Sequence, residues 1–554
     1  MIIFSRFRSD RRPHRQPHKA LFCSFIAVAL IALSACSGQP QATNSRGTKL
    51  TVTTPEAVGD LDSATWGMYR PINSLDPIVA FDYPENTVVA TLCEAILRQQ
   101  PDGSLKPGLA TLKYQAPTTI TLDLRPEVRF WDGTPVTTAD VIFSLQRAAD
   151  PKAGGYYTEV FDRVSSITAT GPNQVTITLK QPDYWLEGEL SSLAGVVVEK
   201  RYAQAHGDSF GTPAGGIMCT GPYRVQTWKA GGDITVTKND SYWDTSAQAK
   251  AKQITFTGVT DASAMAKGLS SGEIDGAYVQ DVVSLPALQR ASSLNIYYGA
   301  SFDSDMFIVT SLAGPLGDVR VRRALSLAFD RKTYIKSAVH GAAQVPRMPT
   351  NPGTWGFAHG VFQQAWDSMP ELKVDLTKAR QLVKEAGADG KTIVIGTSTA
   401  IAGVALEADA WRAAAESIGL KVTLANVSAN NYFNFFVDEK ARANLDALMV
   451  TTYGSYADPA SLESTYALPN GSQNFSGYNN PQITKLFGEA RSEADPEQRA
   501  KLDVEAEKLI MDDLPWIPVS APYVVLVMNK RVTGPPSTFN YMSAPVMAML
   551  GAAG

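Results

Sequence analysis

The feature that most constrains the fold of this chain is an alternation of helical and strand patterns in its second half. Asp375 can cap a helix that ends near Gly387, because apolar residues recur between them at helical spacing. A strand at 393–395, a helix at 405–418 and a strand at 422–425 follow with short connections. This strand–helix–strand alternation predicts α/β layering, with helices packed on a sheet.

A second constraint lies in residues 124–147, which read LRPEVRFWDGTPVTTADVIFSLQR. The first residues alternate as in a strand, and Asp132-Gly133 is turn chemistry. Thr137 and Asp140 have the spacing of a capping box, which satisfies free N–H groups at a helix start. The segment therefore predicts a strand, a tight turn and a capped amphipathic helix. By themselves these residues are interpreted as structural.

Length and charge narrow the class of protein. A chain of 554 residues is too long for one core and predicts roughly three or four lobes. The whole chain carries a net charge of −4, and because its first 35 residues contribute +5, the remainder carries −9. An acidic body argues against binding to a nucleic-acid backbone, so no nucleic-acid partner is expected.

The N-terminus has the pattern of an export signal. Basic residues through Lys19 precede an apolar run from Leu21 to Leu33, which suits a signal peptide better than a membrane span. The run ends in Leu-Ser-Ala-Cys36, which resembles a bacterial lipoprotein processing box and makes Cys36 the expected lipidation site. A simple secretory signal or an uncleaved anchor is the alternative. Residues 36–48 are polar and predict a flexible tether, and no second membrane anchor is expected.

The cysteines and histidines give little indication of a catalytic or metal-binding site. Cys93 and Cys219 could form a disulfide in an export compartment, but two buried thiols are the favoured interpretation. After the signal segment, His206, His340 and His359 are scattered with no metal-ligand spacing. No nucleophile elbow, zinc-protease motif or phosphate-binding loop is present, so neither an enzyme nor a metal or cofactor site is expected.

Several motifs occur in an order that resembles a known family. They are the stretch at 124–147, CTGPYRV at 219–225, SGEID at 271–275, DVRVRRALSLAFDR at 318–331, YGSYADP at 453–459 and LPWIPV at 514–519. Together they are similar to the extracytoplasmic solute-binding proteins, family 5, which serve peptide, nickel and related ATP-binding-cassette (ABC) importers. The resemblance spans the chain beyond the tether and is specific for the family, but not for the substrate.

The resemblance implies an α/β fold of the two-lobed periplasmic-binding-protein type (class II, cluster C) with an extra inserted domain. Its two lobes close around a ligand about a hinge. We expect a signal peptide at 1–35 and a tether at 36–48. We further expect lobe I at 49–92, 200–300 and 512–554, domain II at 93–199, and lobe III at 301–511.

The resemblance also suggests ligand-contacting residues. Tyr453, Ser455, Tyr456 and Asn474 are the candidates. Family members that bind peptides usually have a carboxylate four residues before the proline of the "DP" pair, and it binds the peptide's ammonium. Ser455 occupies that position here. Because a buried ammonium without an anion is costly, either another carboxylate serves or the ligand has no free amine there.

The expected function is that of a lipid-anchored, monomeric substrate-binding protein of an ABC importer, located outside the cytoplasm. It would capture peptides or peptide-like solutes and deliver them to permease subunits. Haem, glycosides and metal chelates remain open as ligands. The alternative is an envelope lipoprotein of the same fold that regulates or scaffolds rather than transports, with which the missing carboxylate is compatible.

Overall fold

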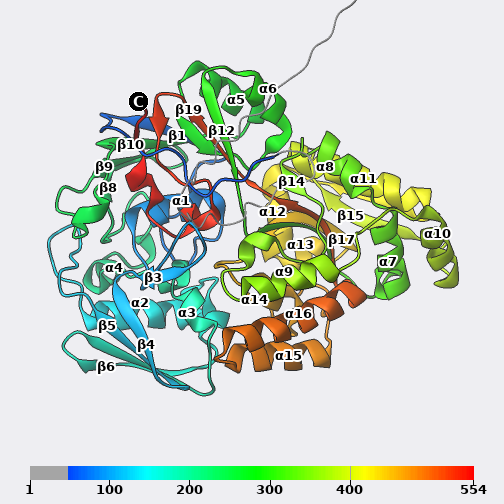
Figure 1. The fold of residues 1–554 in the computed structure, drawn as a ribbon, viewed down its shortest axis with the longest axis horizontal. Coiled ribbons are helices and arrows are strands. Elements are labelled where there is room, and N and C mark those ends of the chain that lie inside the picture. The colour runs from blue at the N-terminus through cyan, green and yellow to red at the C-terminus, as the bar shows by residue number, and fades with distance from the viewer. Residues whose placement is uncertain (1–47, 400) are drawn as a thin grey trace, which may run out of the picture. The chain divides into compact units, whose positions relative to one another are not determined.

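The computed structural model describes residues 48–399 and 401–554. The expected signal peptide, nearly all of the tether and the lipidation site Cys36 lie outside the described residues. Within them, no helix is both long enough and apolar enough to cross a membrane. The expected mixed α/β character is confirmed, and three larger sheets organise the chain (Figure 1).

The seven-stranded sheet is mixed, with β1 parallel to β10 and β11 and the other pairs antiparallel. Its order is β12 (Leu294–Gly299), β19 (Val524–Asn529), β11 (Gly276–Tyr278), β1 (Ala64–Met68), β10 (Gln253–Gly258), β9 (Ile234–Lys238) and β8 (Tyr223–Trp228). The sheet thus combines the beginning, middle and end of the chain.

The six-stranded sheet holds the predicted strand–helix–strand segment. Its order is β14 (Ala343–Gln344), β18 (Trp516–Pro522), β13 (Asp303–Val309), β17 (Ala447–Tyr453), β15 (Thr392–Thr397) and β16 (Lys421–Asn426). The parallel pair β15 and β16 is joined by α11 (Ala402–Ser417), as the alternation predicts. Trp411 of α11 is fully buried against Phe307 and Phe329.

The four-stranded sheet is antiparallel, in the order β4 (Ala110–Ala116), β5 (Thr119–Leu124), β7 (Gln174–Leu179) and β6 (Val164–Gly171). Two small ribbons pair β2 (Leu97–Gln99) with β3 (Leu105–Pro107), and β20 (Val532–Thr533) with β21 (Gly551–Ala552).

The remaining helices fall into three chain segments. The first has α1 (Tyr83–Leu92), α2 (Thr138–Ala149), α3 (Leu186–Glu189) and α4 (Lys200–His206). The second has α5 (Ala262–Ser271), α6 (Leu285–Arg290), α7 (Val319–Ala328), α8 (Arg331–Ser337), α9 (His359–Ser368) and α10 (Leu376–Glu385). The third has α12 (Ala429–Val437), α13 (Glu439–Arg442), α14 (Ala460–Ala467), α15 (Pro481–Ser492) and α16 (Pro496–Asp513), of which α15 and α16 lie side by side (Figure 1).

Locally encoded helix starts are confirmed. α2 begins with the predicted capping box, in which the Thr137 N–H donates to Asp140 Oδ2 at 2.9 Å. Asp375 caps α10 through the Lys378 N–H at 2.8 Å. By contrast, the continuous apolar run at 193–198 predicts a buried strand, and this prediction is wrong, because the segment begins with a 3-10 turn and forms only an isolated bridge at Val196.

The arginine-rich segment 318–331 predicts a solvated helix face, but two of its arginines are buried. Arg322 is buried and donates to the carbonyl oxygens of Leu316 and Asp513, at 2.6 Å each. Arg331, only 1% exposed, donates to the carbonyl oxygens of Ser326 and Pro518. Both guanidinium groups therefore join helix ends to neighbouring segments through hydrogen bonds, because the planar group of N–H donors can bond several carbonyl oxygens at once.

The favoured interpretation of two free thiols is wrong. Cys93, which ends α1, forms a disulfide with Cys219, and their Cα atoms are 4.9 Å apart. Both residues are fully buried, so the bond is shielded from solvent. It joins the two chain segments that lead into and out of the part containing the four-stranded sheet.

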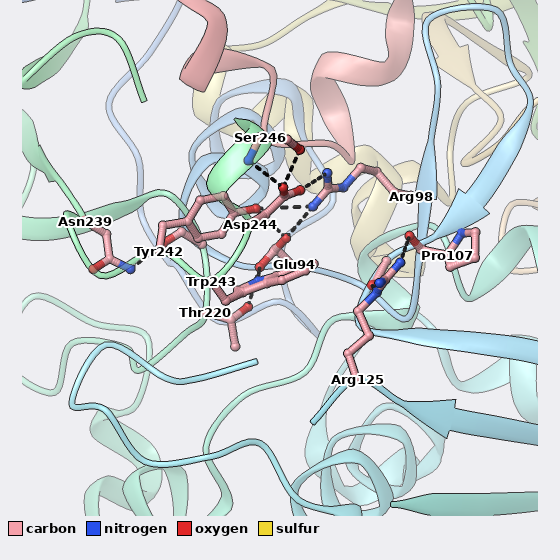
Figure 2. A network of polar contacts seen from close by, with 12 residues as sticks. Glu94, Arg98, Pro107, Arg125, Thr220, Asn239, Tyr242, Trp243, Asp244 and Ser246 are labelled. Atoms are coloured by element: carbon pink, nitrogen blue, oxygen red, sulfur yellow. Dashed lines mark hydrogen bonds and ion pairs between the residues drawn. The ribbon is translucent and has the colours of Figure 1, made fainter. Parts of the chain in front are cut away.

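A buried carboxylate strengthens the same junction. Figure 2 shows Glu94, which follows Cys93, at the centre of a polar network. Its two oxygens accept from Arg98 Nη2 at 2.7 Å, the Tyr242 hydroxyl at 2.8 Å, Thr220 Oγ1 at 2.9 Å and Trp243 Nε1 at 2.8 Å. The Tyr242-Trp243 pair is thus part of the packed framework.

Candidate functional site

The chain crosses twice between the seven-stranded and six-stranded sheets at neighbouring points. One crossing joins β12 to β13 and the other joins β18 to β19, and each strand pairs with its counterpart from the other crossing. Asn351 lies between them and donates to the carbonyl oxygens of Asp303 at 3.2 Å and Pro522 at 2.8 Å. Paired crossings of this kind are suited to act as a hinge.

Tyr83 reaches across from the first lobe, which contains the seven-stranded sheet, to the second lobe, which contains the six-stranded sheet. It is the first residue of α1, and the Asp82 side chain caps its N–H at 2.8 Å. The Tyr83 hydroxyl donates to Asp303 Oδ1 at 2.6 Å. Asp303 is the first residue of β13 and is 8% exposed.

Tyr453 reaches in the opposite direction. It is the last residue of β17 and the register partner of Asp303, so their side chains are cross-strand neighbours. Its hydroxyl donates to the Phe81 carbonyl oxygen at 2.5 Å and accepts from Asn86 Nδ2 at 3.1 Å. Two tyrosines thus join the lobes at one place, one from each side.

Aromatic rings surround this contact and form what we call the aromatic cluster. Its members are Trp66, Tyr83, Tyr278, Tyr453, Phe539 and Tyr541. Phe539 lies 5.3 Å from the Tyr453 ring and 6.2 Å from the Tyr83 ring, and Tyr541 stacks on Tyr278 at 3.8 Å. A small cavity opens beside Trp66, Tyr83 and Tyr278, with Gln280 on its wall.

Carboxylates outnumber cationic groups around this contact. Burial raises the pKa of Asp303 to about 7, while the hydrogen bond from Tyr83 acts against that rise. The nearby Arg70 guanidinium bonds both Asp82 and Glu85, so two carboxylates offset its single charge. Among the described residues, ionised Asp303 would therefore have no cationic side chain bonded to it.

The four candidate ligand residues lie in different surroundings. Tyr453 is in the aromatic cluster. Ser455 is half-buried, and its carbonyl oxygen accepts from Gln99 Nε2, at the end of β2, at 2.8 Å. Tyr456 is 5% exposed, packs against Gly188 and has no hydrogen-bond partner for its hydroxyl among the described residues.

Asn474 differs from the other three because its side chain is used within its own loop. Its amide nitrogen donates to the carbonyl oxygens of Leu468 and Tyr478, and its amide oxygen accepts from the Tyr478 N–H. An amide with these bonds shapes the loop before α15 and has little capacity left for a ligand.

Sequence reasoning missed Tyr83, Asp303, Phe539 and Tyr541. A signal for Asp303 existed, because FDSDMFIV places two carboxylates on one face of an otherwise apolar strand. Carboxylates are rarely buried without partners, so such a pattern points to a special role. Within residues 48–399 and 401–554, no group of His, Cys, Asp and Glu side chains could hold a metal ion.

Comparison with known proteins agrees with this architecture. The model of the bacterial extracellular solute-binding proteins, family 5 (middle part) matches residues 104–474. The periplasmic oligopeptide-binding protein OppA of Salmonella typhimurium strain LT2 is 25% identical over 526 residues, which cover 90% of this chain and 92% of that protein.

Solved structures share the fold at low identity. The Helicobacter pylori periplasmic binding protein DppA in complex with the peptide STSA aligns with a TM-score of 0.78 and 20% identity, covering 90% of this chain and 99% of that one. AgaA of A. tumefaciens R10, in complex with agropinic acid, aligns with a TM-score of 0.77 and 20% identity, covering 88% and 98%. Both the two-lobed fold and the resemblance seen in the sequence are thereby confirmed, and the chain belongs to the bacterial extracellular solute-binding proteins of family 5, which are transport proteins and not enzymes.

Proposed function

We propose that this protein captures peptides or peptide-like solutes between its two lobes and delivers them to the permease subunits of an ABC importer. The observation that carries the proposal is the pair of tyrosine contacts across the lobes, Tyr83 to Asp303 and Tyr453 to Phe81. These contacts lie next to the paired crossings, where lobe movement changes the separation of opposing groups. A ligand seated there would meet both lobes at once.

The ligand site is proposed to include Tyr453, Ser455 and Tyr456 from the sequence analysis, together with Tyr83 and Asp303. Asn474 is left out because its amide is already bonded within its own loop. Family relatives support a peptide ligand, since OppA of Salmonella typhimurium is named for oligopeptides and the H. pylori protein holds a tetrapeptide. AgaA, with agropinic acid, shows that the fold also accepts other solutes.

The division into lobe I, domain II and lobe III also stays a proposal, and the sheets support it with one change. The strand β18 (Trp516–Pro522) belongs to the six-stranded sheet, while β19 (Val524–Asn529) belongs to the seven-stranded sheet. We therefore move the last boundary from residue 512 to residue 523. Domain II at 93–199 contains the whole four-stranded sheet.

We further propose a lipid anchor on Cys36, a location outside the cytoplasm and a monomer. The lipoprotein-like processing box supports the anchor, and periplasmic relatives support the location. The monomer is supported by the site itself, because both of its sides come from one chain. Mass spectrometry of the membrane-extracted protein tests the anchor, since a diacylglycerol-modified N-terminal Cys36 is expected.

Native mass spectrometry of the purified full-length protein tests the transport role. An adduct of a few hundred daltons that fragments as a peptide is the expected result. An adduct of another kind would keep the binding role and change the substrate. A protein that stays empty against peptide and metabolite libraries would overturn the proposal and favour the regulatory or scaffolding alternative.

A further inference from the structure

We propose that Asp303 is the anion that binds a cationic group of the ligand, a primary ammonium, inside the aromatic cluster. This inference rests on the proposed function, since it names the chemistry that the interlobe site recognises. It assigns to Asp303 a task that no residue of the sequence analysis was given.

The charge distribution is the first argument. Among the described residues, no Lys, Arg or His forms an ion pair or hydrogen bond with Asp303. The neighbouring Arg70 is already bonded by Asp82 and Glu85. A carboxylate at a water-poor contact without a counter-charge is costly, so a cation arriving with the ligand would relieve that cost.

The spare acceptor capacity of Asp303 is the second argument. Oδ1 accepts from the Tyr83 hydroxyl at 2.6 Å, and a hydrogen bond with the Ser301 side chain also favours the ionised form of Asp303. Asp303 keeps 8% of its surface exposed, and neither of its oxygens is among the fully buried atoms without a partner. Because an ionised carboxylate has about four acceptor positions, these two hydrogen bonds leave capacity for a donor from the ligand.

The third argument is the surrounding rings. Tyr83 and Tyr453 approach to 5.3 Å between ring centres, and Tyr453 lies opposite Asp303 in the strand register. Aromatic faces attract cations through their quadrupole, and the attraction is stronger where water is scarce. A carboxylate flanked by such rings favours an ammonium over an anionic or neutral group.

The proposal predicts a pH dependence of binding. The titratable groups that face Asp303 are Tyr83 from α1, Asp305 from β13, Tyr453 from β17 and Tyr541 from the 3-10 helix Phe539–Met542. Burial raises the pKa of all three tyrosines, which therefore stay neutral. With an Asp303 pKa of about 7, the ionised fraction falls about 20-fold between pH 7.5 and pH 5.5.

The experiment offers the full-length protein a pool of synthetic tripeptides and tetrapeptides, each present with a free amine and as its N-acetylated twin. Native mass spectrometry then counts which twin is captured. We expect the wild type to prefer the free amine at least about tenfold, and Asp303→Asn to reduce the preference to within about twofold. The capture of free amines should weaken about 20-fold from pH 7.5 to pH 5.5 in the wild type and not in Asp303→Asn.

Asp305→Asn is the matched control, because Asp305 lies two residues along the same strand and its oxygens already accept from Ser520 and Thr451. It should keep the preference. Capture of both twins equally by the wild type, or an unchanged preference in Asp303→Asn, overturns the inference and leaves the proposed function standing. Capture of neither twin by the wild type overturns the proposed function and the inference with it. The wild-type pH profile decides the matter even if Asp303→Asn fails to fold.

Discussion

Reduction of the Cys93–Cys219 disulfide should destabilise the protein strongly. The two half-cystines are 126 positions apart, so the bond closes a long loop that contains the whole four-stranded sheet. In the chain-entropy treatment, a cross-link over this distance removes about 16 cal/mol/K from the unfolded chain, or about 5 kcal/mol at about 25 °C. This value is an upper expectation, because structure that remains in the reduced unfolded chain lowers it.

The assay compares urea unfolding of the oxidised and reduced wild type, followed by tryptophan fluorescence. The same chain serves as its own control, so no packing is altered. Because Cys93 and Cys219 are 1% and 0% exposed, reductant without denaturant should leave the bond intact. A difference below about 1 kcal/mol, or titratable thiols at both Cys93 and Cys219 in the unreduced unfolded protein, would refute the reasoning.

Three other substitutions probe buried charges. Arg491→Met leaves the Asp183 carboxylate, which is 0% exposed, without its main partner. Because the contact between α15 and the segment before α3 then holds an unpaired buried charge, we expect a loss of about 3–5 kcal/mol of stability, seen as a lower melting temperature. Glu94→Ala leaves the Trp243 N–H and other donors unpaired and should cost about 3 kcal/mol by urea unfolding. Glu463→Gln should stabilise the protein at pH 8 and change little at pH 5 by the same measurement.

The sign of the last effect follows from proton binding. Burial raises the pKa of Glu463, and Glu507 and Asp503 raise it further. The folded state therefore holds a proton that the unfolded state releases above its ordinary pKa of about 4.3, so stability falls as pH rises above that value. Glutamine is neutral at both pH values and removes this loss. Equal effects at pH 5 and pH 8 would contradict the explanation.

Simple checks exist for the other two substitutions. Lys485→Met removes an exposed ion pair with Glu489 on the same helix as Arg491, so it should change stability by less than about 0.5 kcal/mol. An equal loss in both variants would mean that the buried charge is not the cause. For Glu94, the variant Glu94→Gln keeps part of the hydrogen bonding, so a loss as large as that of Glu94→Ala would argue against unpaired donors.

The parts of the fold that could be predicted are those with local causes. Caps such as Thr137 with Asp140, and Asp375, act within one helical turn, so the residues that form them are adjacent in the sequence. The apolar run at 193–198 failed as a predicted strand because buried turns and buried strands share the same composition. The sequence pattern in such a run carries no information about its hydrogen bonds.

The candidate site could be predicted only in part because its members are far apart in the chain. Tyr453 was found through the YGSYADP motif, whereas its partners Tyr83 and Asp303 have no shared motif with it. The disulfide was missed for the same reason, since Cα separation depends on the tertiary fold. Only the two acids of β13, in an apolar strand, gave a signal in the sequence.

The contacts that join the lobes explain why a ligand, rather than the protein alone, should control closure. The buried pair of Asp183 in domain II and Arg491 in lobe III fixes the register of the contact between these two parts, with 2.6 Å between Oδ2 and Nη2. Its net contribution is small, because opening would return both charges to water. Other links, such as Tyr83 to Asp303 and Tyr453 to Phe81, are single hydrogen bonds of about 1 kcal/mol each. A ligand that bonds Asp303 and both lobes needs to bind the closed form only a few kcal/mol more tightly than the open form. The closed form then dominates the equilibrium.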